Sequence, residues 1–351
     1  MTSLDVADQK QRPGTKREAL ERLPVIDISS FVGGGYLAAR KEVAARLRQV
    51  CIDVGFFYLA GHGIPGKDFE ELETQAQRFF ALPLDVKMRF ASNGPGKPGF
   101  VRVGGVNPDA NTNKTPDLKE RFVMLRNLTV EAIEASKQGG SHWPEEDLLP
   151  GFTRFMKRHI ADRQALTLSL GRAFALSLFL PENYFDEYFR EQALVTLINF
   201  YPSLDEAELT KNRWSFSPHT DYGAFTILSQ DSIGGLQVRN AAEEWIEVPP
   251  IENTFVVNIG DLMARWTNEL YTSNLHRAAN VSGRSRVSIP FFCAPHPQAR
   301  IHCIETCTGP DNPPKYPEVI CGEYLRALIT ASDTTGQPGI SKRTSERLKT
   351  N

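Results

Sequence analysis

The feature that most constrains the fold is a series of short apolar segments in the second half of the chain. Glycine, asparagine and proline residues separate these segments at close spacing. The predicted strands cover residues 194–201, 224–230, 235–238, 245–248, 254–259 and 286–293. Runs of short strands punctuated by turn residues are typical of β-sandwiches, barrels and jelly rolls.

Helical patterns dominate the first half of the chain. Apolar residues recur at helical spacing over residues 36–54, 67–81 and 151–180, and short strands are expected at 24–28 and 56–59. Residues 91–115 are rich in Gly, Pro and Asn and predict a long loop. Helices followed by many short strands predict an α+β fold built around a barrel or a double-sheet jelly roll.

Composition excludes several classes of protein. The chain has 40 lysines and arginines and 42 aspartates and glutamates, so it has no net positive charge to bind nucleic acid or an anionic membrane. The five cysteines form no CxxC pair, and the first residues lack the apolar core of a signal peptide. We therefore expect a cytoplasmic protein with no nucleic-acid or membrane partner. No sequence pattern indicates its oligomeric state.

A histidine and an aspartate stand two residues apart before one predicted strand. On an extended chain such side chains point to the same side, so His219 and Asp221 would converge while Thr220 faces away. They could supply two legs of a 2-His-1-carboxylate facial triad, which binds non-haem Fe(II). An HxD tripeptide also occurs by chance in exposed polar loops, so the pair alone leaves both interpretations open.

A second histidine changes this balance. His276 follows His219 after several predicted strands, which give the chain enough length to return antiparallel beside it. The third ligand is then available. The three residues together predict a metal centre with open coordination positions.

Two further polar pairs share a strand face. Arg286 and Ser288 could jointly hold a carboxylate, or alternatively take part in a surface salt bridge. Asn199 and Tyr201 form a similar pair, which is also compatible with ordinary polar positions at a strand end. Polar pairs on otherwise apolar strands suggest a lined, wet interior.

These residues carry a resemblance to a known family. The set His219-x-Asp221, His276 and Arg286-x-Ser288, with Asn199-x-Tyr201 before it, resembles the isopenicillin N synthase-like branch of the 2-oxoglutarate and Fe(II)-dependent dioxygenases. Similarity extends from about Pro24 to Tyr324 and includes the segments PVID (24–27), GFFYLAGHGIP (55–65) and DLKERF (117–122).

The resemblance implies an α+β architecture with a double-stranded β-helix, or jelly-roll, core. N-terminal helices would flank this core and a mobile C-terminal helical segment would cover it. We expect one integrated catalytic domain. It would comprise a flexible tail over residues 1–22, a helical and mixed region over 23–190, the jelly-roll core over 191–300, and a lid segment and tail over 301–351.

The resemblance also implies roles for individual residues. His219, Asp221 and His276 would bind Fe(II), with no catalytic residue beyond these ligands. Arg286 and Ser288 would hold the distal carboxylate of the cosubstrate 2-oxoglutarate, assisted by Tyr201 and Asn199. By family position the candidates for substrate binding are Phe100, Arg102, Arg121, Phe122, Trp266 and Phe292, although aromatic residues are more often part of a core.

The expected activity is oxidation of a small-molecule metabolite with O2 and 2-oxoglutarate, releasing succinate and CO2. Hydroxylation is the expected outcome, with desaturation and cyclisation as alternatives. A rival is an isopenicillin N synthase-like oxidase that uses no 2-oxoglutarate. A catalytically silent ligand-binding protein is the alternative from another class.

Overall fold

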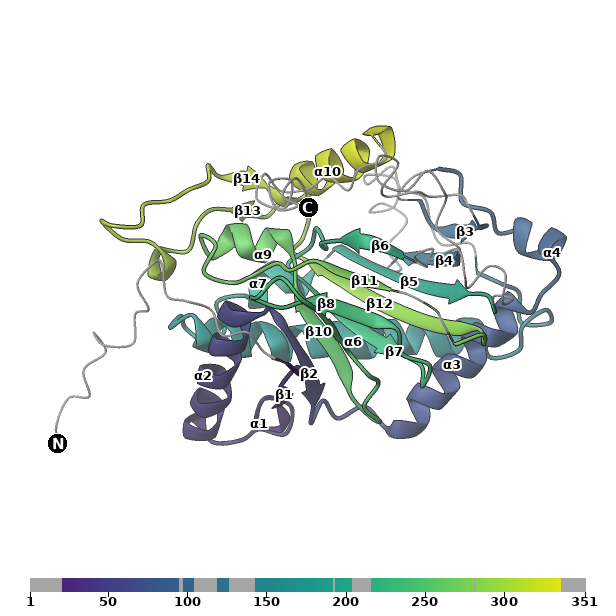
Figure 1. The fold of residues 1–351 in the computed structure, drawn as a ribbon, viewed down its shortest axis with the longest axis horizontal. Coiled ribbons are helices and arrows are strands. Elements are labelled where there is room, and N and C mark those ends of the chain that lie inside the picture. Colours follow the sequence, from purple (N-terminus) through teal and green to yellow (C-terminus); the bar gives the residue numbers. More distant parts are fainter. Residues whose placement is uncertain are drawn as a thin grey trace.

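Two sheets form the centre of the molecule (Figure 1). The computed structural model describes residues 21–94, 97–103, 119–125, 143–191, 193–203, 216–278, 280 and 282–335. The main sheet has eight strands in the order β1-β2-β10-β7-β12-β5-β4-β3, and the small sheet has four in the order β6-β11-β8-β9. Two sheets facing each other, with helices outside, form the double-stranded β-helix within an α+β architecture.

The strands of the main sheet come from both halves of the chain. They are β1 (Val25–Asp27), β2 (Phe56–Ala60), β3 (Gly99–Val101), β4 (Glu120–Leu125), β5 (Ala193–Tyr201), β7 (Phe225–Gln230), β10 (Phe255–Ile259) and β12 (Arg286–Ala294). The small sheet contains β6 (Phe216–His219), β8 (Leu236–Arg239), β9 (Trp245–Glu247) and β11 (His276–Ala278). A separate pair joins β13 (Arg300–Ile301) to β14 (Val319–Ile320).

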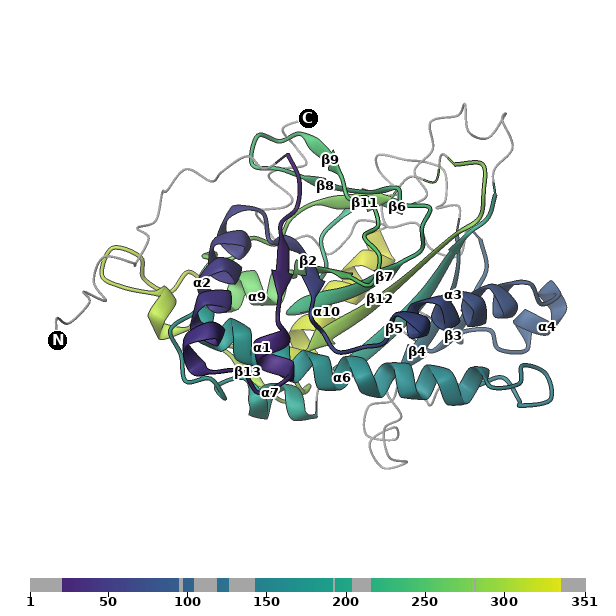
Figure 2. The ribbon, with the colours of Figure 1, turned by 90° about the horizontal axis from the view of Figure 1, so that it is seen from below.

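Helices cover the side of the main sheet that faces away from the small sheet. Figure 2 shows α6 running along this side beside α3. The helices are α1 (Ser29–Val32), α2 (Leu37–Asp53), α3 (Gly66–Phe80), α4 (Leu84–Met88), α6 (Phe152–Ser177), α7 (Asp186–Arg190), α9 (Asp261–Trp266) and α10 (Cys321–Thr335), with a 3₁₀ turn at η2 (Glu305–Cys307). In Figure 1, α10 lies on the other side, near β6.

Strand alternation gives the main sheet two different faces. Cross-strand partners point to the same face, and successive residues point to opposite faces. Phe122 on β4 therefore points toward the helices, where its ring packs 4.4 Å from Phe79 on α3 and 6.3 Å from Phe152 on α6. Residues of the opposite parity, such as Thr226 and Asn258, face the small sheet. We call this second face the inner face.

Most predicted elements are present with ends shifted by a few residues, and two regions differ. The predicted loop over residues 91–115 contains strand β3, because Phe100 pairs with Phe122 across the sheet edge. The short strands β6 and β11 were not among the predicted strands, although the ligand motifs that they carry were identified. The predicted tail over 1–22 lies almost wholly outside the described residues.

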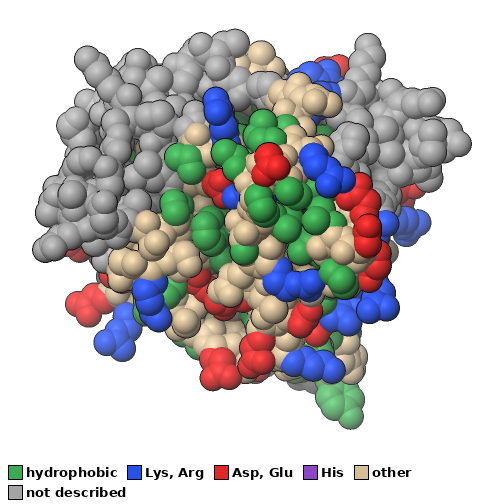
Figure 3. Space-filling view, turned by 90° about the vertical axis from the view of Figure 1, so that its right-hand side faces the viewer, with side chains coloured by type: hydrophobic (Ala, Val, Ile, Leu, Met, Phe, Trp, Pro, Cys, Tyr) green, Lys and Arg blue, Asp and Glu red, His purple; other side chains and the backbone are tan. Residues whose placement is uncertain are grey.

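The described residues give two further properties, one of the helices and one of the surface. None of their helices combines the length and apolar character required to cross a membrane. The face in Figure 3 carries acidic and basic side chains interspersed around a central hydrophobic group, so neither sign of charge dominates there.

Candidate metal centre and cosubstrate pocket

The two predicted histidine ligands lie side by side on the small sheet. His219 is the last residue of β6 and His276 the first of β11, and they are direct antiparallel partners. Their ring centroids are 4.1 Å apart, and the exposed fractions of their side chains are 11% and 10%. Strand pairing thus brings together two imidazoles that are distant in sequence.

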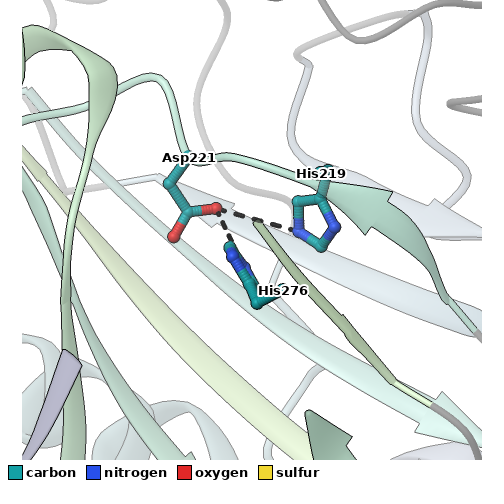
Figure 4. A group of neighbouring side chains, drawn as sticks. All are labelled: His219, Asp221 and His276. Atoms are coloured by element: carbon teal, nitrogen blue, oxygen red, sulfur yellow. Dashed lines mark ion pairs between the residues drawn. The ribbon is translucent and has the colours of Figure 1, made fainter. Parts of the chain in front are cut away.

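Asp221 lies in the turn just after β6, and the main sheet orients its carboxylate. Oδ2 accepts hydrogen bonds from the Thr226 hydroxyl on β7 at 2.5 Å and the Asn258 amide on β10 at 2.8 Å. Oδ1 lies 3.9 Å from Nε2 of His219 and 3.7 Å from Nε2 of His276 (Figure 4). The donors on one oxygen therefore direct the other oxygen toward the histidines.

Backbone carbonyls set the tautomer of both histidines. Nδ1 of His219 lies 2.8 Å from the Ser217 carbonyl, and Nδ1 of His276 lies 3.3 Å from the Asn274 carbonyl. A carbonyl oxygen only accepts, so each Nδ1 carries the hydrogen and each Nε2 presents its lone pair. Burial, reinforced by the neighbouring His276, lowers the pKa of His219 well below its usual range and keeps the ring neutral.

This arrangement fits a metal ion of a particular kind. The candidate ligand atoms of His219, Asp221 and His276 all lie within 4.8 Å of one another, and no other group of this kind occurs among the described residues. Two imidazole nitrogens and one carboxylate oxygen gathered on one side form a facial triad, which suits Fe(II) and leaves positions open for small molecules. The residues therefore fit the predicted metal.

The start of α9 supports the turn that carries Asp221. The Asp261 N–H donates to the Asp221 carbonyl at 2.7 Å, and the Thr220 hydroxyl donates to the Asp261 carboxylate at 3.1 Å. A Cβ at Gly260 would lie 2.2 Å from the Gly223 carbonyl oxygen, so only glycine allows this close approach. Burial raises the pKa of Asp261 to about 6.

The four predicted cosubstrate residues are cross-strand neighbours. Arg286 on β12 pairs with Tyr201 on β5, and Ser288 pairs with Asn199. Ser288 has the same strand parity as Phe292, which pairs with Thr226, the donor to Asp221. The four side chains therefore belong to the inner face, as do Thr226 and Asn258, which hold Asp221.

Among these four residues, Arg286 shows the clearest sign of a ligand site. Its side chain is only 1% exposed, and its Cζ lies 4.8 Å from the centre of the Tyr201 ring. Nε donates to the Gly234 carbonyl, whereas Nη1 is buried without a hydrogen-bond partner among the described residues. Oδ1 of Asn199 is also buried without a hydrogen-bond partner among the described residues. Buried polar atoms are nearly always paired, so these two atoms are available to a bound group.

A carboxylate is the group that fits beside Arg286. The nearby Asp231 carboxylate accepts backbone hydrogen bonds from Val287 and, at 3.0 Å, from Ile233. The planar guanidinium can donate from two nitrogens to a second carboxylate. The distal carboxylate of 2-oxoglutarate has this chemistry.

The predicted substrate residues separate into two groups. Phe292 is half-buried on the inner face, and Arg121 shares that face as the partner of Asn199; Arg102 is exposed after β3. Phe100, Phe122 and Trp266 lie elsewhere. Phe100 and Phe122 pack against Phe79 on the helical side, and the Trp266 ring packs 4.9 Å from Phe185 and 4.8 Å from Tyr188. These three aromatic residues belong to the core, so we do not include them in the proposed substrate pocket.

Sequence reasoning missed the residues that orient the metal group. Thr226 and Asn258 sit inside predicted apolar strands, and nothing in the local sequence connects them with Asp221. Lys119 was also missed, although its ammonium lies 2.9 Å from the centre of the Phe216 ring, next to His219. Polar residues at inward positions of apolar strands are the signal that could have indicated the first two.

A two-histidine, one-carboxylate group between the sheets of a double-stranded β-helix defines the class of non-haem Fe(II) oxygenases. Comparison with known proteins gives the family. Residues 192–295 match the 2OG-Fe(II) oxygenase superfamily, and residues 23–146 match the family described as non-haem dioxygenase in morphine synthesis N-terminal. The chain belongs to the 2OG-Fe(II) oxygenase superfamily.

Individual relatives agree over most of the chain. The 2-oxoglutarate-Fe(II) type oxidoreductase ppzC of Metarhizium majus is 36% identical over 331 residues, covering 88% of this chain and 87% of the relative. The oxidoreductase hxnY of Emericella nidulans is 32% identical, covering 88% and 90%. The crystal structure of a full-length Neurospora crassa protein in complex with alpha-KG and thymine has a TM-score of 0.80 at 29% identity, covering 88% and 97%. The protein is an oxidoreductase that requires Fe(II), 2-oxoglutarate and O2.

Proposed function

We propose that this protein, as a member of the isopenicillin N synthase-like branch, hydroxylates a small-molecule metabolite. One oxygen atom of O2 would enter the metabolite and the other would enter succinate, with loss of CO2 from 2-oxoglutarate. The observation that carries this proposal is the buried Nη1 of Arg286, which has no partner among the described residues and lies on the inner face of the main sheet, where Thr226 and Asn258 hold Asp221. A buried guanidinium nitrogen without a hydrogen-bond partner is costly, and the distal carboxylate of 2-oxoglutarate would supply the acceptor.

The side chains divide the work of binding. His219, Asp221 and His276 would hold Fe(II) from one side, with Thr226 and Asn258 fixing the orientation of the carboxylate. When bound, Fe(II) supplies one-electron chemistry with O2 that amino-acid side chains lack. Each histidine is held through Nδ1, which leaves Nε2 for the metal, and the lowered pKa of His219 keeps that ring free of the proton it would otherwise lose on binding.

The cosubstrate and the substrate would occupy different parts of the inner face. Arg286 and Ser288 would hold the distal carboxylate of 2-oxoglutarate, with Tyr201 and Asn199 beside them. Phe292, in line with Thr226 across β7 and β12, would contact the substrate next to the metal. A small-molecule substrate is supported by the Neurospora relative, whose structure holds thymine together with alpha-KG.

An anaerobic titration tests the cosubstrate. Full-length protein with Fe(II) should develop the metal-to-ligand absorption band when 2-oxoglutarate is added, and aerobic turnover of a screened metabolite should release succinate. His276→Ala should abolish both, whereas His302→Ala, at an exposed position, should retain both. Turnover without 2-oxoglutarate would favour the oxidase alternative. Tight ligand binding without O2 consumption would favour the silent alternative.

We also propose that the protein works in the cytoplasm. All five cysteines are buried and unpaired, as expected in a reducing compartment. Fractionation of cells with an antibody to the chain tests this, and recovery from a secreted or organellar fraction would contradict it.

A further inference from the structure

The end of strand β7 is followed by a buried carboxylate that has no role in the function proposed above. Asp231 is the first residue after β7, and only 7% of its surface is exposed. Its backbone N–H donates to the Val287 carbonyl at 3.3 Å, and its Oδ2 accepts the Val287 N–H. These bonds continue the pairing of β7 with β12 beyond Gln230 and Ser288. Asp231 is therefore fastened to the residue that follows Arg286.

The second oxygen of Asp231 shapes the turn that comes next. Oδ1 accepts the Ile233 N–H at 3.0 Å, a contact between residues two apart that is typical of aspartate in turns. The turn leads to Gly234, whose φ of +79° lies in the left-handed region. A Cβ at this position would lie 3.2 Å from Cδ of Pro250, so packing as well as backbone conformation favours glycine.

This turn and strand β12 meet at the guanidinium of Arg286. Its Nε donates to the Gly234 carbonyl, and its buried Nη1 has no partner among the described residues. Because a guanidinium is planar and rigid, fixing Nε also fixes the directions of the N–H groups on the other two nitrogens. Asp231 holds both sides of this contact, namely Val287 on the strand and the turn that presents the Gly234 carbonyl.

Charge alone gives no reason for a carboxylate at this position. An anion close to the pocket would repel the distal carboxylate of 2-oxoglutarate, because like charges repel. Both oxygens of Asp231 accept backbone N–H groups, and none of the ion pairs of the described residues joins it to Arg286. Its contacts are therefore those of a side chain that shapes the backbone.

We infer that Asp231 is a positioning residue for the cosubstrate. It holds β12 and the turn over residues 231–234 together, so that the Gly234 carbonyl orients Arg286 and the remaining guanidinium N–H groups are directed at the distal carboxylate of 2-oxoglutarate. Asp231 acts through Arg286 and makes no contact of its own with the cosubstrate. This inference rests on the proposed function and adds to it the residue that sets the position of Arg286.

Asp231→Asn tests the inference, because position and charge predict opposite results. Asparagine keeps one side-chain acceptor and places an NH2 group against a backbone N–H, so one of the two contacts is lost. We expect the dissociation constant of 2-oxoglutarate to rise about tenfold, as expected for a lost buried hydrogen bond. Removal of a nearby negative charge would by itself lower this constant. The absorption band of the full-length protein with Fe(II), recorded anaerobically, measures it.

Two comparisons accompany this variant. Fe(II) affinity should be unchanged in Asp231→Asn, because Asp231 has no contact with the metal group. Asp27→Asn is the matched control, since Asp27 also accepts a backbone N–H two residues on, that of Ser29 at 2.8 Å, but lies on β1 at the far edge of the main sheet. The control should bind 2-oxoglutarate as the unmodified protein does.

A double-mutant cycle separates positioning from a general loss of structure. Arg286→Lys keeps a charge in the pocket but has no guanidinium for the Gly234 carbonyl to orient. If Asp231 acts through that guanidinium, adding Asp231→Asn to Arg286→Lys should change 2-oxoglutarate affinity by less than about twofold. A further tenfold loss would show that Asp231 acts independently of Arg286 and would contradict the inference.

A second substitution keeps the inference testable if Asp231→Asn does not fold. Gly234→Ala should displace the carbonyl that holds Arg286 and weaken 2-oxoglutarate binding, because both the backbone and the contact with Pro250 oppose a Cβ there. Gly34→Ala is its control, since Gly34 has a similar φ of +78° and a Cβ there meets nothing within 4 Å. The control should carry the same backbone strain and retain full affinity.

The outcomes distinguish this inference from the proposed function. Unchanged or tighter 2-oxoglutarate binding in Asp231→Asn would overturn the inference, and so would full affinity in Gly234→Ala. Absence of the absorption band in the unmodified protein, or full affinity in Arg286→Ala, would overturn the proposed pocket and this inference together. A normal band that depends on Arg286 but not on Asp231 would overturn this inference alone.

Discussion

At the scale of single residues, the geometry of the metal group depends on side chains that cannot themselves bind metal. Thr226 and Asn258 occupy one carboxylate oxygen of Asp221, and backbone carbonyls occupy Nδ1 of both histidines. Each potential ligand is thus left with one atom directed at a common point. Such orienting contacts typically change metal affinity by about 10–100-fold when they are removed.

Thr226→Val tests this orienting role. The substitution keeps the branched shape of the side chain and removes the hydroxyl that donates to Asp221 at 2.5 Å. We expect Fe(II) affinity to fall by about 10–100-fold, because the carboxylate can then rotate. Anaerobic Fe(II) titration measures the change, and thermal unfolding of the apoprotein checks that the fold is intact. Unchanged affinity would show that Asn258 alone suffices.

Arg286→Ala tests the cosubstrate pocket. Removing the buried guanidinium should weaken 2-oxoglutarate binding by about 2–5 kcal/mol, as truncation of a buried charge pair does. Arg286→Lys should restore only part of the affinity, because an ammonium lacks the planar two-donor geometry. The dissociation constant from the absorption band measures both variants. Wild-type affinity in Arg286→Ala would place the distal carboxylate elsewhere.

At the scale of elements, the end of α2 supports the segment that leads into β11. Gly55 ends this helix with φ +68°, and a Cβ there would lie 1.9 Å from the Thr272 carbonyl oxygen. The Thr272 N–H donates to the Cys51 carbonyl at 2.8 Å, and the Asn274 amide donates to the Val54 carbonyl at 3.2 Å. Helix α2 therefore helps to hold the chain just before His276.

Gly55→Ala should be strongly destabilising. The left-handed backbone and the clash with Thr272 together should cost more than about 2 kcal/mol of unfolding free energy. Gly309→Ala is the control, since a Cβ there meets nothing within 4 Å and its φ is ordinary. Chemical denaturation of the two variants measures the difference. Equal stabilities would contradict the close approach.

A buried histidine on α6 should make stability depend on pH. Burial, followed by the neighbouring Arg163 and Arg158 charges, lowers the pKa of His159 well below its usual range. The native ring therefore stays neutral while the unfolded chain takes up a proton below about pH 6.5. Because the unfolded state then binds more protons, stability should fall as pH falls below that value, by about 1.4 kcal/mol per pH unit.

Comparison with His159→Gln isolates this contribution. Glutamine does not titrate, so its unfolding free energy should decline less between pH 7 and pH 5 than that of the unmodified protein. Denaturation curves at several pH values give both slopes. The difference matters because other groups titrate too: the raised pKa of Asp261, about 6, has the opposite effect on native stability in acid. Equal slopes for the two proteins would show that His159 takes up a proton equally in the native and unfolded states.

At the scale of the whole molecule, the N-terminal region is part of the core sheet. Strands β1 to β4 precede residue 190, yet they occupy positions on both sides of the later strands in the main sheet. β2 pairs with β10 and β4 pairs with β5, while α3 and α6 cover the sheet. The catalytic core should therefore not fold without the residues before it.

An isolated fragment tests this integration. Residues 191–300 alone would expose two strand edges and the apolar face that α6 covers, so we expect no cooperative unfolding transition. The full chain should unfold in a single transition. Circular dichroism during heating measures both. A cooperative transition in the fragment would show that the core is an independent domain.

The sequence alone determined the types of most elements and the candidate ligands. Hydrophobic periodicity is a local property, so α2, α3, α6 and the longer strands could be predicted within a few residues. The HxD motif and the later histidine could also be identified as candidate metal ligands from the sequence. Pairing decided the rest: β3 forms only because β4 lies beside it, and β11 is three residues long. Its place is set by its partners β6 and β8.

Only the tertiary structure decided which side chains meet. Phe100 and Phe122 looked like substrate contacts, but strand parity turns them toward α3, away from the metal group. The same parity turns Thr226 and Asn258 toward Asp221. The order of residues along a strand is a property of the sequence, whereas the face they occupy depends on register between strands. Register arises from contacts between distant segments, which no local pattern contains.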